Sequence, residues 1–62
     1  MTTYTFTDTA RDNFEFYVDA DVLPEAVLII EKYMPAHFAT STIKGSDTLL
    51  PEWLAKARQL FA

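Results

Sequence analysis

The chain has 62 residues, a formal net charge of -4 at pH 7, no cysteine and one glycine. This length predicts one small domain over residues 1–62, and the lack of cysteine excludes disulfides and thiolate metal ligands. The acidic balance argues against direct contact with nucleic-acid phosphates, which requires a basic face. Because 50% of the residues are hydrophobic and 15% are aromatic, the composition is that of a folded chain.

The sequence also bears on location. No apolar run approaches the roughly 20 residues that span a bilayer. The first residues, Met1 to Asp12, lack the basic-then-apolar order of a signal peptide. We therefore expect no membrane contact and a cytoplasmic protein.

Two strands are predicted in the first third of the chain. Residues 3–7 alternate aromatic side chains with threonine, and residues 14–19 alternate apolar side chains with Glu15, Tyr17 and Asp19. Alternation of this kind is typical of half-buried strands. The polar segment from Asp8 to Asn13 is rich in turn-forming residues, so we expect it to join the strands as a hairpin.

A helix is predicted next. We expect the Asp21 carboxylate to cap its first turn and Pro24 to lie within that turn. Leu28 lies about 160° around the helix from Ile30, so it points away from the main apolar stripe. Pro35 is expected to end the helix. The stripe itself consists of Leu23, Ala26, Val27, Ile30, Tyr33 and Met34.

The rest of the chain predicts a strand and a second helix. Residues 38–43 read as a third strand whose buried face is either Phe38/Thr40/Thr42 or Ala39/Ser41/Ile43, and Gly45 suits a positive φ after it. The C-terminal helix, from about Leu50 to Phe61, carries a stripe that we expect to be core and to cover Leu28. Its members are Leu50, Trp53, Leu54, Ala57, Leu60 and Phe61. Glu52 and Lys56 have the favourable i,i+4 order for an ion pair.

These elements together predict the α+β class. The expected order is β-β-α-β-α, with a three-stranded antiparallel sheet, a helix on one face and a C-terminal amphipathic helix closing the core.

Residues that could carry chemistry are few. His37 is the only histidine and is expected in a surface loop, and the serines are Ser41 and Ser46. The carboxylates lie at strand and helix edges, in a chain too small to enclose a substrate pocket of about 300 Å³ or more. We therefore expect a protein that is not an enzyme and that uses no metal and no cofactor.

The acidic residues along the first helix and its preceding strand allow two interpretations. They are either a solvated face or a docking surface for a basic patch on a partner protein, where opposite charge raises the association rate. The set comprises Glu15, Asp19, Asp21, Glu25 and Glu31.

The segment from Phe14 to Lys44 resembles the gene 2 product of T7-like podophages, a family of small inhibitors of host bacterial RNA polymerase. The resemblance is carried by Phe14-Glu15, by the helix start Ala20-Asp21-Val22-Leu23-Pro24-Glu25-Ala26, by Glu31, by the exit Tyr33-Met34-Pro35-Ala36-His37-Phe38 and by Ile43-Lys44. It covers half of the chain, and the Tyr-x-Pro-Ala-x-Phe exit is its most specific part.

The resemblance implies one helix against a small antiparallel sheet, bound to the jaw of the polymerase β′ subunit so that transcription initiation is blocked. It implies partner contacts by Asp21, Glu25, Glu31 and Lys44. The family's arginine pair corresponds here to Thr42 and Lys44, and Pro24 and Leu28 stand at acidic positions of its helix. The C-terminal helix has no counterpart in the family pattern.

Two other functions remain open. The first is another acidic phage anti-host protein, such as an inhibitor of a restriction or CRISPR complex. This hypothesis predicts strongly salt-dependent binding. The second is a small structural subunit that docks its C-terminal helix into a larger protein.

Overall fold

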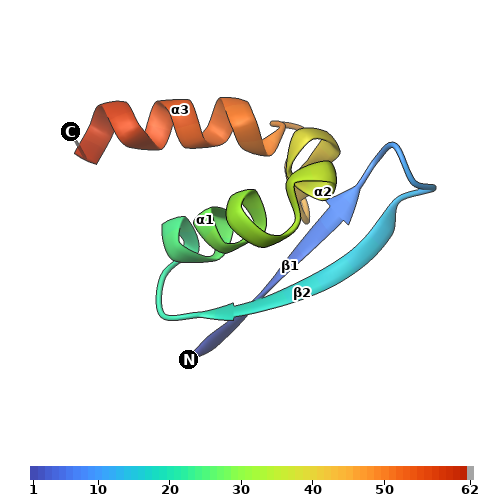
Figure 1. Ribbon diagram of the computed structural model, residues 1–62, viewed down its shortest axis with the longest axis horizontal. Coiled ribbons are helices and arrows are strands. Elements are labelled where there is room, and N and C mark those ends of the chain that lie inside the picture. Colours follow the sequence, from blue (N-terminus) through green and yellow to red (C-terminus); the bar gives the residue numbers. More distant parts are fainter. Residues whose placement is uncertain (62) are drawn as a thin grey trace.

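The computed structural model describes residues 1–61, with side chains as far as Gln59. It confirms the α+β class and the three-stranded antiparallel sheet, and adds one short helix (Figure 1). The packing predicted for the Leu60 and Phe61 side chains lies outside the described residues. The elements are β1 Thr2–Asp8, β2 Phe14–Ala20, α1 Leu23–Tyr33, α2 Pro35–Thr40, β3 Ser41–Ile43 and α3 Leu50–Phe61.

The sheet has the order β2-β1-β3, so β1 is the central strand. Phe6 lies opposite Phe16 on β2 and opposite Ile43 on β3, and both pairings are antiparallel. The predicted hairpin between β1 and β2 is confirmed. Its loop places Asp12 (φ 54°) and Asn13 (φ 57°) in the left-handed region, which these two residue types tolerate better than most.

The predicted third strand over residues 38–43 is wrong in its first half. Residues Pro35–Thr40 form α2, and only Ser41–Ile43 are extended. Pro35 ends α1, as predicted, because it forces Met34 out of helical geometry (φ -134°). Its fixed φ and missing N–H also suit the first turn of a helix, so the same residue begins α2.

The buried face of β3 is the one that carries Ser41 and Ile43. Ser41 lies opposite Asp8 and Ile43 opposite Phe6, and directly opposite residues project to the same face of a sheet. Thr42 projects to the other face but is also buried, with 6% exposure, and pairs with Leu49 in an isolated bridge. The predicted positive φ of Gly45 is confirmed at 86°.

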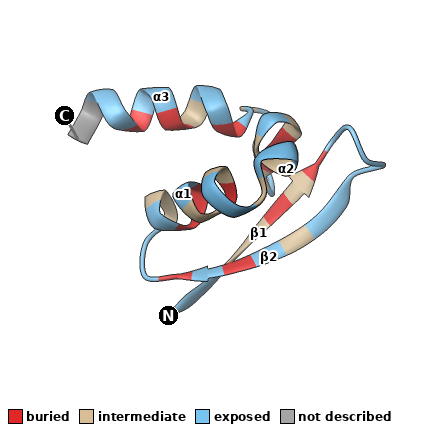
Figure 2. Ribbon diagram, viewed as in Figure 1, coloured by how far each residue is buried: buried red, intermediate tan, exposed pale blue. Residues whose placement is uncertain are grey.

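The core lies between the sheet and the helices (Figure 2). α1 covers the sheet with its predicted stripe, of which Ala26, Val27 and Ile30 are fully buried. α3 lies on the other side of α1 from the hairpin (Figure 1). Leu50 and Leu54 of α3 belong to the same core cluster as Phe6, so the described part of its stripe is core, as predicted. None of the described helices has the length and apolar composition needed to cross a membrane.

Candidate binding surfaces

The four residues predicted to contact a partner do not form one surface. Asp21 and Glu25 are exposed at the start of α1. Glu31, near the end of α1, forms an ion pair with Arg58 of α3 at 3.3 Å. Lys44 follows β3, and its Nζ lies 3.3 Å from Glu15 Oε1. Since Glu15 alternates with the inward-facing Phe14 and Phe16, this pair lies on the sheet face away from the helices.

The predicted capping role of Asp21 is wrong. Val22 is the N-cap residue of α1, with an extended backbone, and no side chain caps the helix. The helix thus begins one residue too late for Asp21 to occupy the capping position, and its exposed carboxylate faces solvent. Pro24 lies in the first turn, as predicted.

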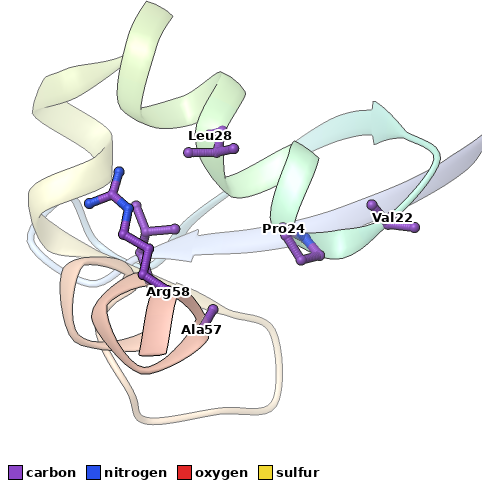
Figure 3. A pocket seen from close by; sticks show the side chains of 6 residues that line it. Val22, Pro24, Leu28, Ala57 and Arg58 are labelled. Carbon is purple, nitrogen blue, oxygen red and sulfur yellow. The ribbon is translucent and has the colours of Figure 1, made fainter. Parts of the chain in front are cut away.

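An apolar groove of about 600 Å³ runs between α1 and α3 (Figure 3). From α1 and its N-cap come Val22, Pro24 and Leu28, and from α3 come Leu54, Ala57 and Arg58. Pro24, Leu28 and Glu31 are spaced i, i+4 and i+7, so they share one side of the helix. The Glu31–Arg58 ion pair bridges the two helices beside the groove.

Leu28 is only partly covered by α3. The sequence predicts that α3 covers it, and α3 does lie across the groove from it, but 45% of Leu28 stays exposed. Leu50, at the start of α3, is fully buried, whereas the groove lies further along α3, where Leu54, Ala57 and Arg58 line it. Val22 at the groove is 54% exposed, so the site presents aliphatic surface to solvent.

A buried carboxylate at the opposite end of the sheet is a feature that the sequence reasoning missed. Asp8 is fully buried at the end of β1. Its Oδ2 lies 2.7 Å from both Arg11 Nη1 and His37 Nδ1. Its Oδ1 accepts from Thr40 Oγ1 at 2.7 Å and from the Ala10 amide at 3.1 Å. The carboxylate therefore joins the hairpin loop to the middle and the end of α2.

The hydrogen bonds keep Asp8 ionised. Burial by itself works to raise the pKa of Asp8, but the bonds from Thr40, His37, Arg11 and the Ala10 amide outweigh it and lower the pKa from 3.8 to about 2. An ionised carboxylate accepts hydrogen bonds only, so His37 Nδ1 carries the shared proton.

His37 is not the loop residue that the sequence predicts. It lies within α2, and its ring is 5.2 Å from the Phe16 ring and 6.0 Å from the Phe14 ring. The alternation Tyr4-Phe6-Asp8 was the signal available in the sequence, since it places Asp8 on the inward face of β1. The turn-like composition after Asp8 concealed it.

The network does not form a nucleophilic site. Ser41 lies opposite Asp8 in the sheet, but its buried Oγ has no hydrogen-bond partner among the described residues and is not coupled to His37. A catalytic serine requires that coupling to a base. Across residues 1–61, no group of three His, Cys, Asp or Glu side chains is placed to hold a metal ion. The Asp8 network therefore has a structural role, because its hydrogen bonds hold α2 against the hairpin loop.

Comparison with known proteins adds no family: no family model, curated protein or solved structure matches this chain.

Proposed function

We propose that this protein is a phage-encoded inhibitor that binds bacterial RNA polymerase in the host cytoplasm and blocks transcription initiation. The resemblance over Phe14 to Lys44 suggests this partner. The arrangement of α1 on one face of a three-stranded antiparallel sheet is compatible with what that resemblance implies.

The observation that carries the proposal is the exposed surface at the start of α1. Asp21 and Glu25 are both exposed there. Val22 and Leu28, at 54% and 45% exposure, present aliphatic surface at the adjoining groove. Charged groups beside an apolar patch match the composition of protein-binding sites, in which apolar contacts supply affinity and charges supply orientation.

The other two proposed contacts have smaller roles in this geometry. Glu31 is held by Arg58, and Lys44 is held by Glu15. Both ion pairs are solvent-exposed and therefore weak, so a partner can exchange them at a cost below about 1 kcal/mol each. The surface at Asp21 and Glu25 is accordingly the primary contact, and Lys44 a secondary one on a different face.

The test is binding and inhibition with purified components. The protein is incubated with bacterial RNA polymerase holoenzyme, and co-elution and promoter-dependent transcription are measured. We expect the wild-type protein to co-elute and to suppress transcription. In the double variant Asp21→Asn/Glu25→Gln we expect binding and inhibition to be about tenfold weaker, since rim charges act mainly through the association rate.

The matched control is Asp47→Asn/Glu52→Gln. It removes the same charge from exposed positions outside α1, so it separates a local contact from a general effect of net charge. Failure of the wild-type protein to co-elute and to inhibit would refute the polymerase proposal. Equal losses in the two double variants would refute the assignment of the surface.

The structure also bears on one alternative. A role as a subunit that docks α3 into a larger protein requires α3 to detach, yet Leu50 is fully buried and Leu54 is 4% exposed. Detaching this helix would remove core contacts of the protein itself. That burial argues against the docking-helix alternative.

A further inference from the structure

The outer edge of β2 is a free strand edge. In the sheet order β2-β1-β3, β2 has one neighbour, and it forms the outer border of the sheet (Figure 1). It is paired with β1 over its whole length, from Phe14 to Ala20. The other edge strand, β3, has only three residues and is bridged by Leu49. β2 is therefore the longer and more accessible of the two edges.

The register identifies which backbone groups point outward. The Thr5 carbonyl accepts from the Lys44 amide at 3.0 Å, so the odd-numbered residues of β1 turn their backbone groups toward β3. The even-numbered residues of β1 then bond to β2, through their partners Val18 and Phe16. The amides and carbonyls of Glu15, Tyr17 and Asp19 consequently face away from the sheet. No other described segment bonds to them.

The side chains of these same residues give the edge a charge pattern. Glu15, Tyr17 and Asp19 project to the face away from the helices, and all three are exposed. The inward-facing side of the strand carries apolar residues, of which Phe14 is 53% exposed. An added antiparallel strand would meet two carboxylates on one face, four residues apart, and apolar side chains on the other. It would share these carboxylates with Lys44, which pairs with Glu15, and with Thr3, whose hydroxyl donates to Asp19.

A second copy of the chain is a poor fit to this edge. Pairing two β2 strands antiparallel over their full length would set Glu15 opposite Asp19 twice. Like charges directly opposite each other destabilise a sheet.

We propose that the outer edge of β2 binds an extended basic segment of a partner protein as a fourth strand of the sheet. The segment carries Lys or Arg four residues apart, opposite Glu15 and Asp19, and apolar residues at the intervening positions beside Phe16 and Val18. Backbone hydrogen bonds supply affinity and the alternating side chains supply specificity. This interaction does not depend on the polymerase proposal, which concerns the start of α1.

The experiment uses the intact protein and the peptide TVKVTVKVT, blocked at both ends. Antiparallel pairing of its central threonine with Tyr17 sets its lysines opposite Glu15 and Asp19. Binding is followed by amide NMR shifts and hydrogen exchange. At a peptide concentration ten times its Kd, we expect exchange of the Glu15, Tyr17 and Asp19 amides to slow about tenfold, by mass action.

Two peptide controls separate the backbone from the charges. TVEVTVEVT keeps the strand propensity and reverses the charge, and N-methylation of the central threonine removes the N–H that bonds to the Tyr17 carbonyl. We expect each change to weaken binding about fivefold or more, as lost cross-strand charge pairs and hydrogen bonds do.

Two protein variants test the same edge from the other side. Tyr17→Pro removes an outward N–H that β1 does not use, as edge strands tolerate, and Glu15→Gln/Asp19→Asn removes both charges. Each variant is expected to bind TVKVTVKVT about fivefold more weakly or worse. Thermal unfolding confirms that the variant is folded. If Tyr17→Pro fails to fold, the double variant and the methylated peptide still decide the question.

Three results would overturn the proposal. The first is no binding of TVKVTVKVT at millimolar concentration. The second is equal binding of the acidic peptide, or binding without protection of the Glu15, Tyr17 and Asp19 amides. The third is protection of these amides by self-association without peptide, which would make the occupant a second copy.

Discussion

The two ends of the molecule hold their helices by different means. At the Asp8 end, one buried carboxylate joins the hairpin loop to α2 through Arg11, His37 and Thr40. At the groove end, α1 and α3 face each other through Leu28, Leu54 and Ala57, with the Glu31–Arg58 ion pair beside them. The first contact consists of directional hydrogen bonds to a buried group. The second is apolar and leaves a groove of about 600 Å³ open to solvent.

This difference explains which surface is free to bind. Hydrogen bonds to a buried charge require fixed geometry, and breaking them exposes an unpaired group, so the Asp8 end is committed to the fold. Apolar contact is non-directional and roughly proportional to area. A partner can therefore cover Leu28 and Val22 without removing any bond of the protein.

The largest expected effect is at Asp8. Asp8→Ala removes the shared acceptor of Arg11, His37 and Thr40, and we expect a loss of about 3 kcal/mol in the free energy of unfolding, at the low end for a broken buried pair because Arg11 is partly exposed. Urea unfolding at pH 7 measures it. Asp47→Ala, at an exposed carboxylate, is the control. A loss no larger than that of the control would mean that the network does not hold α2.

The next effect concerns the groove wall. Leu54 is 4% exposed, and Leu54→Ala should cost about 2.5 kcal/mol through lost burial and the cavity that it leaves. The same unfolding experiment applies. A much smaller cost would show that α3 is loosely held along its whole length, and would restore the possibility that it detaches.

The pH dependence of stability tests the charge at the Asp8 end. The pKa of Asp8 is lower in the folded protein, about 2, than the ordinary 3.8 of the unfolded chain. The ionised Asp8 therefore contributes about 2 kcal/mol to the free energy of unfolding above about pH 4, and this contribution is lost as the pH falls through 2. We expect the stability difference between wild type and Asp8→Asn to shrink by about that amount between pH 4 and pH 2. A difference independent of pH would contradict the ionised network.

The smallest effect is expected at Leu28. Because 45% of this side chain is exposed, Leu28→Ala should change the free energy of unfolding by less than about 1 kcal/mol, as a substitution outside the core does. Comparison with Leu54→Ala across the same groove is the relevant measurement. Equal costs at the two positions would mean that α3 closes onto α1 in solution and that the groove is not an open surface.

The sequence predicted much of the fold but less of the candidate sites. Glu25 is exposed on α1 and Asp21 is exposed just before it, while Glu31 forms an ion pair with Arg58 and Lys44 forms one with Glu15. Those partners are distant in sequence, and no local pattern indicates them. The capping prediction for Asp21 failed by one residue, because an exposed Val22 takes the N-cap position without any side-chain bond.

What the sequence determined by itself is what depends on near neighbours. The alternation in β1 and β2, the apolar stripe of α1 around Ile30 and the prolines in the first turns of α1 and α3 determined those elements and most of the core. The tertiary structure alone decided the state of residues 35–40, of which 38–40 were predicted to belong to a strand rich in Thr and Ile over residues 38–43. That segment is a helix in which His37 and Thr40 reach Asp8, about thirty residues away along the chain. A buried charge needs hydrogen-bond partners, and the tertiary fold decides which residues supply them. The neighbouring residues in the sequence do not reveal their identity.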